Sequence, residues 1–183
     1  LRVTRTGELS MWKGCATASA TRAAIFAAQL ASDGMTGPGE PFDGPSGLCQ
    51  LALAGQSITP DVMGGVNEPF RIINTTVKNY PSQIHTQAPI GLALELQPKL
   101  NIADIKSITI HTYSNAVSTP SDAPEKWAPK TRESADHSIP FTVAAALRDG
   151  QVTPNTFTDS SITDTNIAKI IEKITLKEVL SFT

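Results

Sequence analysis

The sequence PEKWAPKTRESADHSIPF, residues 124–141, is the stretch around which the rest of the chain is organised. It places charged groups and a histidine directly before an apolar segment of helical character at residues 142–147. Because proline fixes φ and disfavours helix in the residue before it, Pro124 and Pro129 predict an extended first half. A helix that follows such a flank offers backbone N–H donors, cations and an imidazole, which suits a small anionic ligand.

Both ends of that helix carry residues with distinct backbone preferences. Pro140 fits the first helical turn, and Gly150 follows the apolar segment as a stop signal. Residue types that accept hydrogen bonds from a first helical turn come shortly before it. We therefore expect the cap from among Ser134, Asp136 and Ser138.

Outward from this helix, the hydrophobic pattern predicts further strands and helices. Residues 102–113 alternate, with Ile108 and Ile110 on one face, and predict a half-buried strand. Residues 70–80 predict another strand, and residues 84–96 predict a helix. Apolar residues at helical intervals predict a final amphipathic helix containing Ile167, Ile170, Ile171 and Ile174. This order of elements predicts a small two-layer α/β unit.

The N-terminal third has a different composition. Alanine dominates residues 15–31, which predict a buried packing helix, and residues 44–54 predict a shorter second helix. The composition changes near the Thr59-Pro60 pair, where we expect a linker. The fold class is therefore predicted as α+β, with a helical part over residues 1–60 and a two-layer α/β domain over residues 61–183.

The totals exclude several classes of function. The 183 residues include 15 Lys and Arg against 17 Asp and Glu, without a basic stripe or an apolar run of roughly 20 residues, so we expect no nucleic acid and no membrane as partner. We expect Cys15 and Cys49 to be buried thiols in a protein of a reducing compartment. Three dispersed histidines without HExxH or CxxC argue against a metal, and the absence of GxGxxG or a P-loop argues against a nucleotide cofactor.

Four single residues could carry chemistry, and each has a plainer alternative. Lys13 lies between a tryptophan and a glycine, where it could equally be a surface lysine. Lys78, at the end of a predicted strand, could face solvent. His137 follows Asp136, which could cap the helix or orient the ring. His111, on a predicted strand, reads as structural.

The run at residues 124–138 resembles the PEKW-x-PKTRE-x-ADHS signature of the MmgE/PrpD family, in its 2-methylcitrate dehydratase branch. Residues 78–87, KNYPSQIHTQ, are similar to the family's K-x-Y-P-x-E-x-H-x-Q stretch. The resemblance implies the end portion of an all-helical domain followed by an α/β lid domain, with the site in the cleft between them. It also implies a homodimer that is cytoplasmic in bacteria or mitochondrial in fungi.

The resemblance further implies an activity and a set of site residues. The activity is a metal-independent, cofactor-free hydro-lyase reaction that removes water from the tricarboxylate 2-methylcitrate to give 2-methyl-cis-aconitate in propionate catabolism. The catalytic residues would be Lys13, Lys78 and His137. The substrate-binding residues would be His85, Gln87, Lys130 and Arg132.

Two positions depart from the family pattern. Gln83 stands where dehydratases commonly have glutamate and cis-aconitate decarboxylases have histidine, and Phe141 stands where relatives usually have tyrosine. Decarboxylation of cis-aconitate, epimerisation of a small dicarboxylate and a non-catalytic interaction role therefore stay open.

The chain begins at Leu1 and ends at Thr183 without signals of a terminus, so we expect a piece of a longer polypeptide. The remaining segments of that polypeptide would then be partners of this one. The family's helical region supplies further acid and base residues, so we expect residues 1–183 to be inactive alone.

Overall fold

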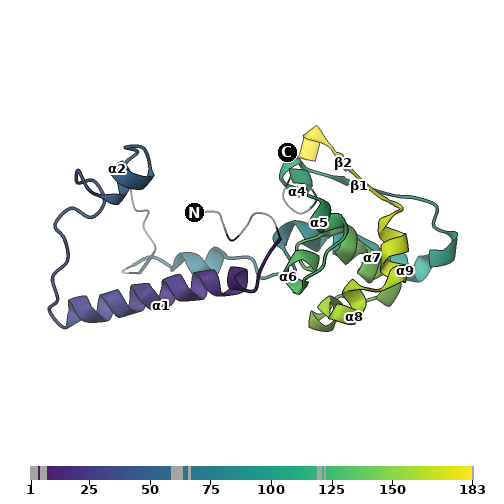
Figure 1. Ribbon diagram of the computed structural model, residues 1–183, viewed down its shortest axis with the longest axis horizontal. Coiled ribbons are helices and arrows are strands. Elements are labelled where there is room, and N and C mark those ends of the chain that lie inside the picture. The colour runs from purple at the N-terminus through teal and green to yellow at the C-terminus, as the bar shows by residue number, and fades with distance from the viewer. Residues whose placement is uncertain are drawn as a thin grey trace. The chain divides into compact units, whose positions relative to one another are not determined.

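The computed structural model describes residues 4, 8–58, 64–65, 67–118, 121 and 123–182. The chain separates into two compact units, which are described one at a time. One unit comprises Leu1–Ala16 and Lys78–Thr183, and the other comprises Thr17–Val77. The Thr59-Pro60 pair, where we expect a linker, lies outside the described residues. Figure 1 shows the elements of both units, and no described helix is long and apolar enough to cross a membrane.

The alanine-rich segment forms the helix α1 (Trp12–Ser32), which confirms the predicted helix. The expectation that this helix is buried is wrong for the described structure, because none of its residues is buried. Even its large side chains, Ile25 and Phe26, are 56% and 60% exposed. Alanines favour the helix through their high propensity but offer little apolar area to bury.

Two further predictions in this region need correction. The second helix, α2 (Leu48–Ala52), is shorter than predicted. Residues 70–80 do not form a strand. The 3₁₀ helix η2 (Arg71–Asn74) replaces its start, with Ile73 N donating to Phe70 O at 3.0 Å. Ile72 and Ile73 are more than 70% exposed, so the apolar residues that suggested a strand face away from any packed layer.

The core of the other unit is built on the helix α7 (Ile139–Asp149), which is buried at nine consecutive positions. It packs against α3 (Gln87–Leu96) and α9 (Thr165–Ile171). As predicted, Ser138 caps it by accepting a hydrogen bond from Phe141 N at 3.0 Å, and Gly150 ends it in the left-handed conformation with φ of 65°. Glycine adopts that conformation without steric cost, which explains the stop.

The segment before α7 is only partly extended, although its first half was expected to be extended throughout. It forms two single-turn helices, α5 (Pro124–Trp127) and α6 (Arg132–Ala135). Pro124 occupies the first turn of α5, where its missing N–H is tolerated. Of the three predicted caps only Ser138 caps α7: Ser134 lies inside α6, and Asp136 lies at its C-terminal end.

The sheet has two parallel strands, β1 (Ile108–Thr112) and β2 (Ile174–Glu178), in the register Ile108↔Ile174 to Thr112↔Glu178. The alternation predicted for β1 is confirmed, since Ile108 and Ile110 are half-buried and Thr109 and His111 are exposed. Ile174 was predicted in the last helix but opens β2. Pairing with β1 overrides the helical spacing of the isoleucines, and that pairing joins distant parts of the chain.

The remaining elements connect these layers. The predicted helix over residues 84–96 is confirmed as the 3₁₀ turn η3 (Ile84–Thr86) followed by α3. The shorter elements are η4 (Gln97–Lys99), η5 (Ile102–Asp104), α4 (Ser114–Ser118), η6 (Pro154–Phe157), α8 (Asp159–Ile162) and η7 (Leu180–Phe182). The predicted α+β class is confirmed as a mostly helical chain with one small parallel sheet.

The burial of α7 yields a test of the core. Replacing Ile139, which is 0% exposed, by alanine should lower the free energy of unfolding by about 2–5 kcal/mol, because the change leaves a cavity. Leu180→Ala, at a position 83% exposed, should change it by less than about 0.5 kcal/mol. Urea unfolding followed by circular dichroism measures both, and equal effects would contradict the assignment of α7 to the core.

Candidate functional site

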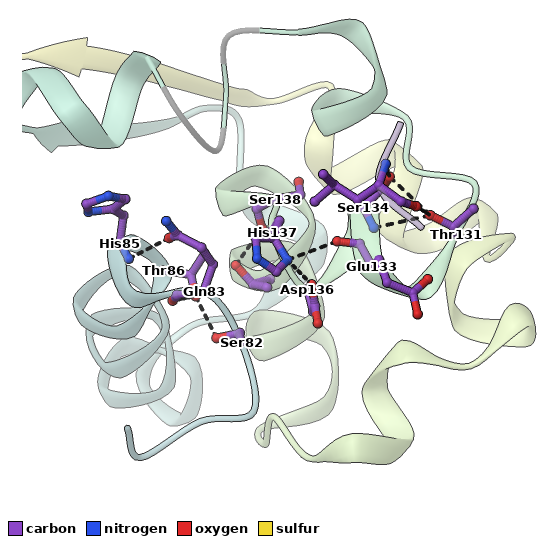
Figure 2. A network of polar contacts seen from close by, with 12 residues as sticks. Ser82, Gln83, His85, Thr86, Thr131, Glu133, Ser134, Asp136, His137 and Ser138 are labelled. Atoms are coloured by element: carbon purple, nitrogen blue, oxygen red, sulfur yellow. Dashed lines mark hydrogen bonds and ion pairs between the residues drawn. The ribbon is translucent and has the colours of Figure 1, made fainter. Parts of the chain in front are cut away.

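Two segments that are far apart in the sequence meet through a backbone hydrogen bond. Gln83 N donates to Asp136 O at 2.9 Å. This bond joins the turn before α3 to the turn between α6 and α7, and each turn carries a histidine, His85 on one side and His137 on the other (Figure 2). The two histidines that sequence analysis selected therefore belong to one polar network.

The turn before α3 is held in shape by the side-chain amide of Gln87. Its Oε1 accepts from Tyr80 N at 3.0 Å, and its Nε2 donates to Tyr80 O at 3.1 Å and to Ser82 Oγ at 3.1 Å. Ser82 Oγ lies 2.6 Å from Thr86 Oγ1, which in turn donates to Gln83 O at 2.8 Å. Because the Thr86 hydroxyl donates its hydrogen to Gln83 O, the Ser82 hydroxyl must be the donor to Thr86 Oγ1. The hydrogen bonds therefore run in one direction, from Gln87 through Ser82 and Thr86 to Gln83 O.

These contacts give Gln87 a role in shaping the turn. Its part in substrate binding stays a prediction. The same turn holds Lys78, whose Nζ donates to Ser82 O at 2.8 Å while the side chain remains exposed. An ammonium held against a carbonyl at the edge of the site is available to an anionic group from solvent.

His85 is fixed at both its backbone and its ring. Its backbone N–H donates to Gln83 Oε1 at 2.6 Å, and its ring Nδ1 is hydrogen-bonded to the hydroxyl of Tyr113. Burial lowers the pKa of His85, so the imidazole is neutral at neutral pH. Gln83, the first departure from the family pattern, thus orients His85 through a hydrogen bond that its amide oxygen accepts.

His137 is oriented by two acceptors. Its Nδ1 lies 3.0 Å from Glu133 O and is hydrogen-bonded to the carboxylate of Asp136. Because both neighbours can only accept, the hydrogen of the neutral ring resides on Nδ1, and Nε2 carries the lone pair. Of the two roles that the sequence left open for Asp136, this contact favours orientation of the His137 ring, since Ser138 caps the helix.

The N-terminal segment is attached to the same region. Leu9 N donates to Ser134 Oγ at 3.4 Å, and Thr131 Oγ1 donates to Leu9 O at 3.3 Å. Leu9 is 4% exposed. This attachment fixes the chain four residues before Lys13, which lies half-buried in the first turn of α1.

Two predicted substrate-binding residues remain, Lys130 and Arg132. Lys130 and Arg132 flank Thr131 and are exposed. Lys130 lines a cavity of about 570 Å³ together with Trp127 and Phe141. Phe141, the second departure, is 1% exposed and packs on Phe157 with ring centroids 6.1 Å apart.

The third histidine, His111, lies on the exposed face of β1 and lines a separate groove of about 770 Å³. Sequence analysis missed Tyr113 because its role depends on a contact across 28 positions of the chain, for which a single sequence offers no local signal. Within the described part of the chain, histidine, cysteine, aspartate and glutamate side chains do not gather in groups of three that could hold a metal ion.

Two models of known protein families match this chain. Residues 80–183 match the MmgE/PrpD C-terminal domain, and residues 1–61 match the MmgE/PrpD N-terminal domain. The C-terminal match alone covers more than half of the chain and contains Lys130, Arg132 and both histidines of the network. The resemblance to the MmgE/PrpD family is thereby confirmed, and this chain belongs to that family.

Proposed function

We propose that the protein is a carbon–oxygen lyase that dehydrates 2-methylcitrate to 2-methyl-cis-aconitate. Its family includes dehydratases, which supports the reaction class. The observation that carries the proposal is the Gln83–Asp136 backbone bond, because it brings two differently oriented histidines and Lys78 into one polar network.

The chemistry explains why such a set is useful. Removal of a proton next to a carboxylate is hard, because the developing negative charge adds to one already present. Cations at the carboxylates lower that cost, and each preorganised contact of this kind typically contributes on the order of 3 kcal/mol. Lys78 supplies one cation at the edge of the network, and Lys13, Lys130 and Arg132 are the further clamps that the family pattern implies.

His137 is the base in this scheme. Its Nε2 lone pair takes the proton, the electron pair of the C–H bond forms the double bond, and the C–O bond breaks. The departing hydroxide becomes water with a proton from a protonated group at the site, for which Lys13 and Lys78 are the candidates. The carboxylate of Asp136 stabilises the imidazolium that results.

Decarboxylation of cis-aconitate is the second candidate. Gln83 keeps this reaction open, because its amide, which accepts from His85 N, cannot serve as the carboxylate acid or base that dehydratases commonly have there. Epimerisation of a small dicarboxylate would need the same clamps. In a non-catalytic interaction role, neither histidine would have to contact a ligand.

A first test of the proposed reaction concerns His137 as the general base. With 2-methylcitrate and a chelator present, the full-length protein should give a rise in ultraviolet absorbance from the conjugated enoate. His137→Gln should lower kcat by roughly 10²–10⁴-fold, because it removes general base catalysis. His111→Gln, on the exposed face of β1, is the matched control and should leave the rate unchanged.

A flat absorbance trace from folded wild-type protein would contradict dehydration. In that case, carbon dioxide release from cis-aconitate decides whether the second candidate takes its place. If the His137→Gln variant were as active as the wild type, the proposed reaction would stand, but His137 would not be its base.

A second test of the proposed reaction concerns the ammonium of Lys78, at the turn before α3. Lys78→Met should lower kcat/KM by about 100-fold, because it removes a charge that meets a substrate carboxylate. Lys106→Met, at an exposed position away from the network, is the matched control and should stay within about twofold of wild type. Steady-state kinetics at two ionic strengths measure both, and equal losses in the two variants would contradict a specific contact at Lys78.

A further inference from the structure

Tyr113 follows directly after β1 and reaches His85, which lies 28 positions earlier in the chain. The Tyr113 hydroxyl is hydrogen-bonded to His85 Nδ1, and the two rings meet edge to face with centroids 5.4 Å apart at 71°. The backbone of His85 is fixed separately by Gln83 Oε1 at 2.6 Å. Since the backbone and Nδ1 are both held, Nε2 is the ring nitrogen left to meet a ligand.

The proton in the Tyr113–His85 hydrogen bond can be assigned from chemistry. A phenol is a far stronger acid than a neutral imidazole N–H, and an imidazole lone pair is a better acceptor than a phenol oxygen. Tyr113 therefore donates and His85 Nδ1 accepts, which leaves the hydrogen of the neutral ring on Nε2. Burial, which lowers the pKa of His85, agrees with a neutral ring.

The same reasoning gave His137 the opposite tautomer. Its Nδ1 faces the Asp136 carboxylate and the Glu133 carbonyl, so its Nε2 is an acceptor. His85 and His137 thus present opposite functions to the space beyond their rings, one a donor and the other an acceptor. A donor suits a carboxylate or hydroxyl oxygen, and an acceptor suits a proton to be removed.

We infer that Tyr113 is a positioning residue that holds His85 as an Nε2–H donor to an oxygen of the carboxylate substrate. The identity of that substrate rests on the proposed function, whereas the tautomer of His85 rests on the contact with Tyr113. The role assigned to His85 is binding and orientation, and no proton leaves its ring.

The tautomer can be measured directly by long-range ¹H–¹⁵N NMR of the histidine rings, with His85 assigned through His85→Gln. In the wild type, His85 Nδ1 should have the shift of an unprotonated, hydrogen-bonded nitrogen, and Nε2 that of a protonated one. Tyr113→Phe should move the Nδ1 signal to the value of an imidazole without that bond. Tyr80→Phe changes the only other tyrosine of the sequence and should leave both signals in place.

Two NMR outcomes would overturn the inference. One is a wild-type His85 with its hydrogen on Nδ1, and the other is a Tyr113→Phe spectrum identical to that of the wild type. Neither measurement needs turnover, so a failure of the proposed reaction and a failure of this inference are distinguished.

Kinetics supply a second, independent readout in the full-length protein. Tyr113→Phe should raise KM about fivefold with kcat little changed, which is the loss expected when one hydrogen bond to substrate is misaligned. A fall in kcat with unchanged KM would overturn the assignment, because Tyr113 would then act in the chemical step and not through substrate positioning.

Discussion

The start of α7 is the constraint on which the rest of the Lys78–Thr183 part depends. The helix is buried at nine consecutive positions, so the polar groups at its N-terminus must find partners inside the protein. Ser138 meets this demand in both directions, since its hydroxyl accepts from Phe141 N and donates to Lys126 O. That second bond ties α5 to the start of α7, and the connection between them contains α6 and, after it, His137.

The polar network follows from that placement. His137 directly precedes the Ser138 cap, so the burial of α7 fixes where its ring can lie, and Asp136 and Glu133 fix how the ring is turned. The backbone carbonyl of Asp136 then accepts from Gln83 N and sets the position of His85. The core thus positions both histidines, and the different roles that we propose for them follow from the partner at each Nδ1, a carboxylate for one and a phenol for the other.

Local signals predicted the elements that local physics decides. Ser138, Pro140 and Gly150 mark the ends of α7 through backbone preferences that act within a single turn, and the alternation around Ile108 reflects one buried face. The extended conformation predicted from Pro124 is wrong, because proline is also compatible with the first turn of a short helix. Ile174 fits the helical spacing of the preceding isoleucines, and only its pairing with Ile108 assigns it to a strand. Likewise, the motifs identified His85 and His137, but their joining through Gln83 and Asp136 and the contact with Tyr113 required the tertiary structure.

We propose that the two histidine segments form one site for a carboxylate substrate. The sequence contains three histidines, so all of them can be followed in one ring-nitrogen NMR titration with propane-1,2,3-tricarboxylate, an unreactive analogue that lacks the hydroxyl. We expect the signals of His85 and His137 to shift together with one dissociation constant, while the signal of His111 on the exposed face of β1 stays unchanged. Shifts at only one of the two, or no shift at either, would contradict a shared site.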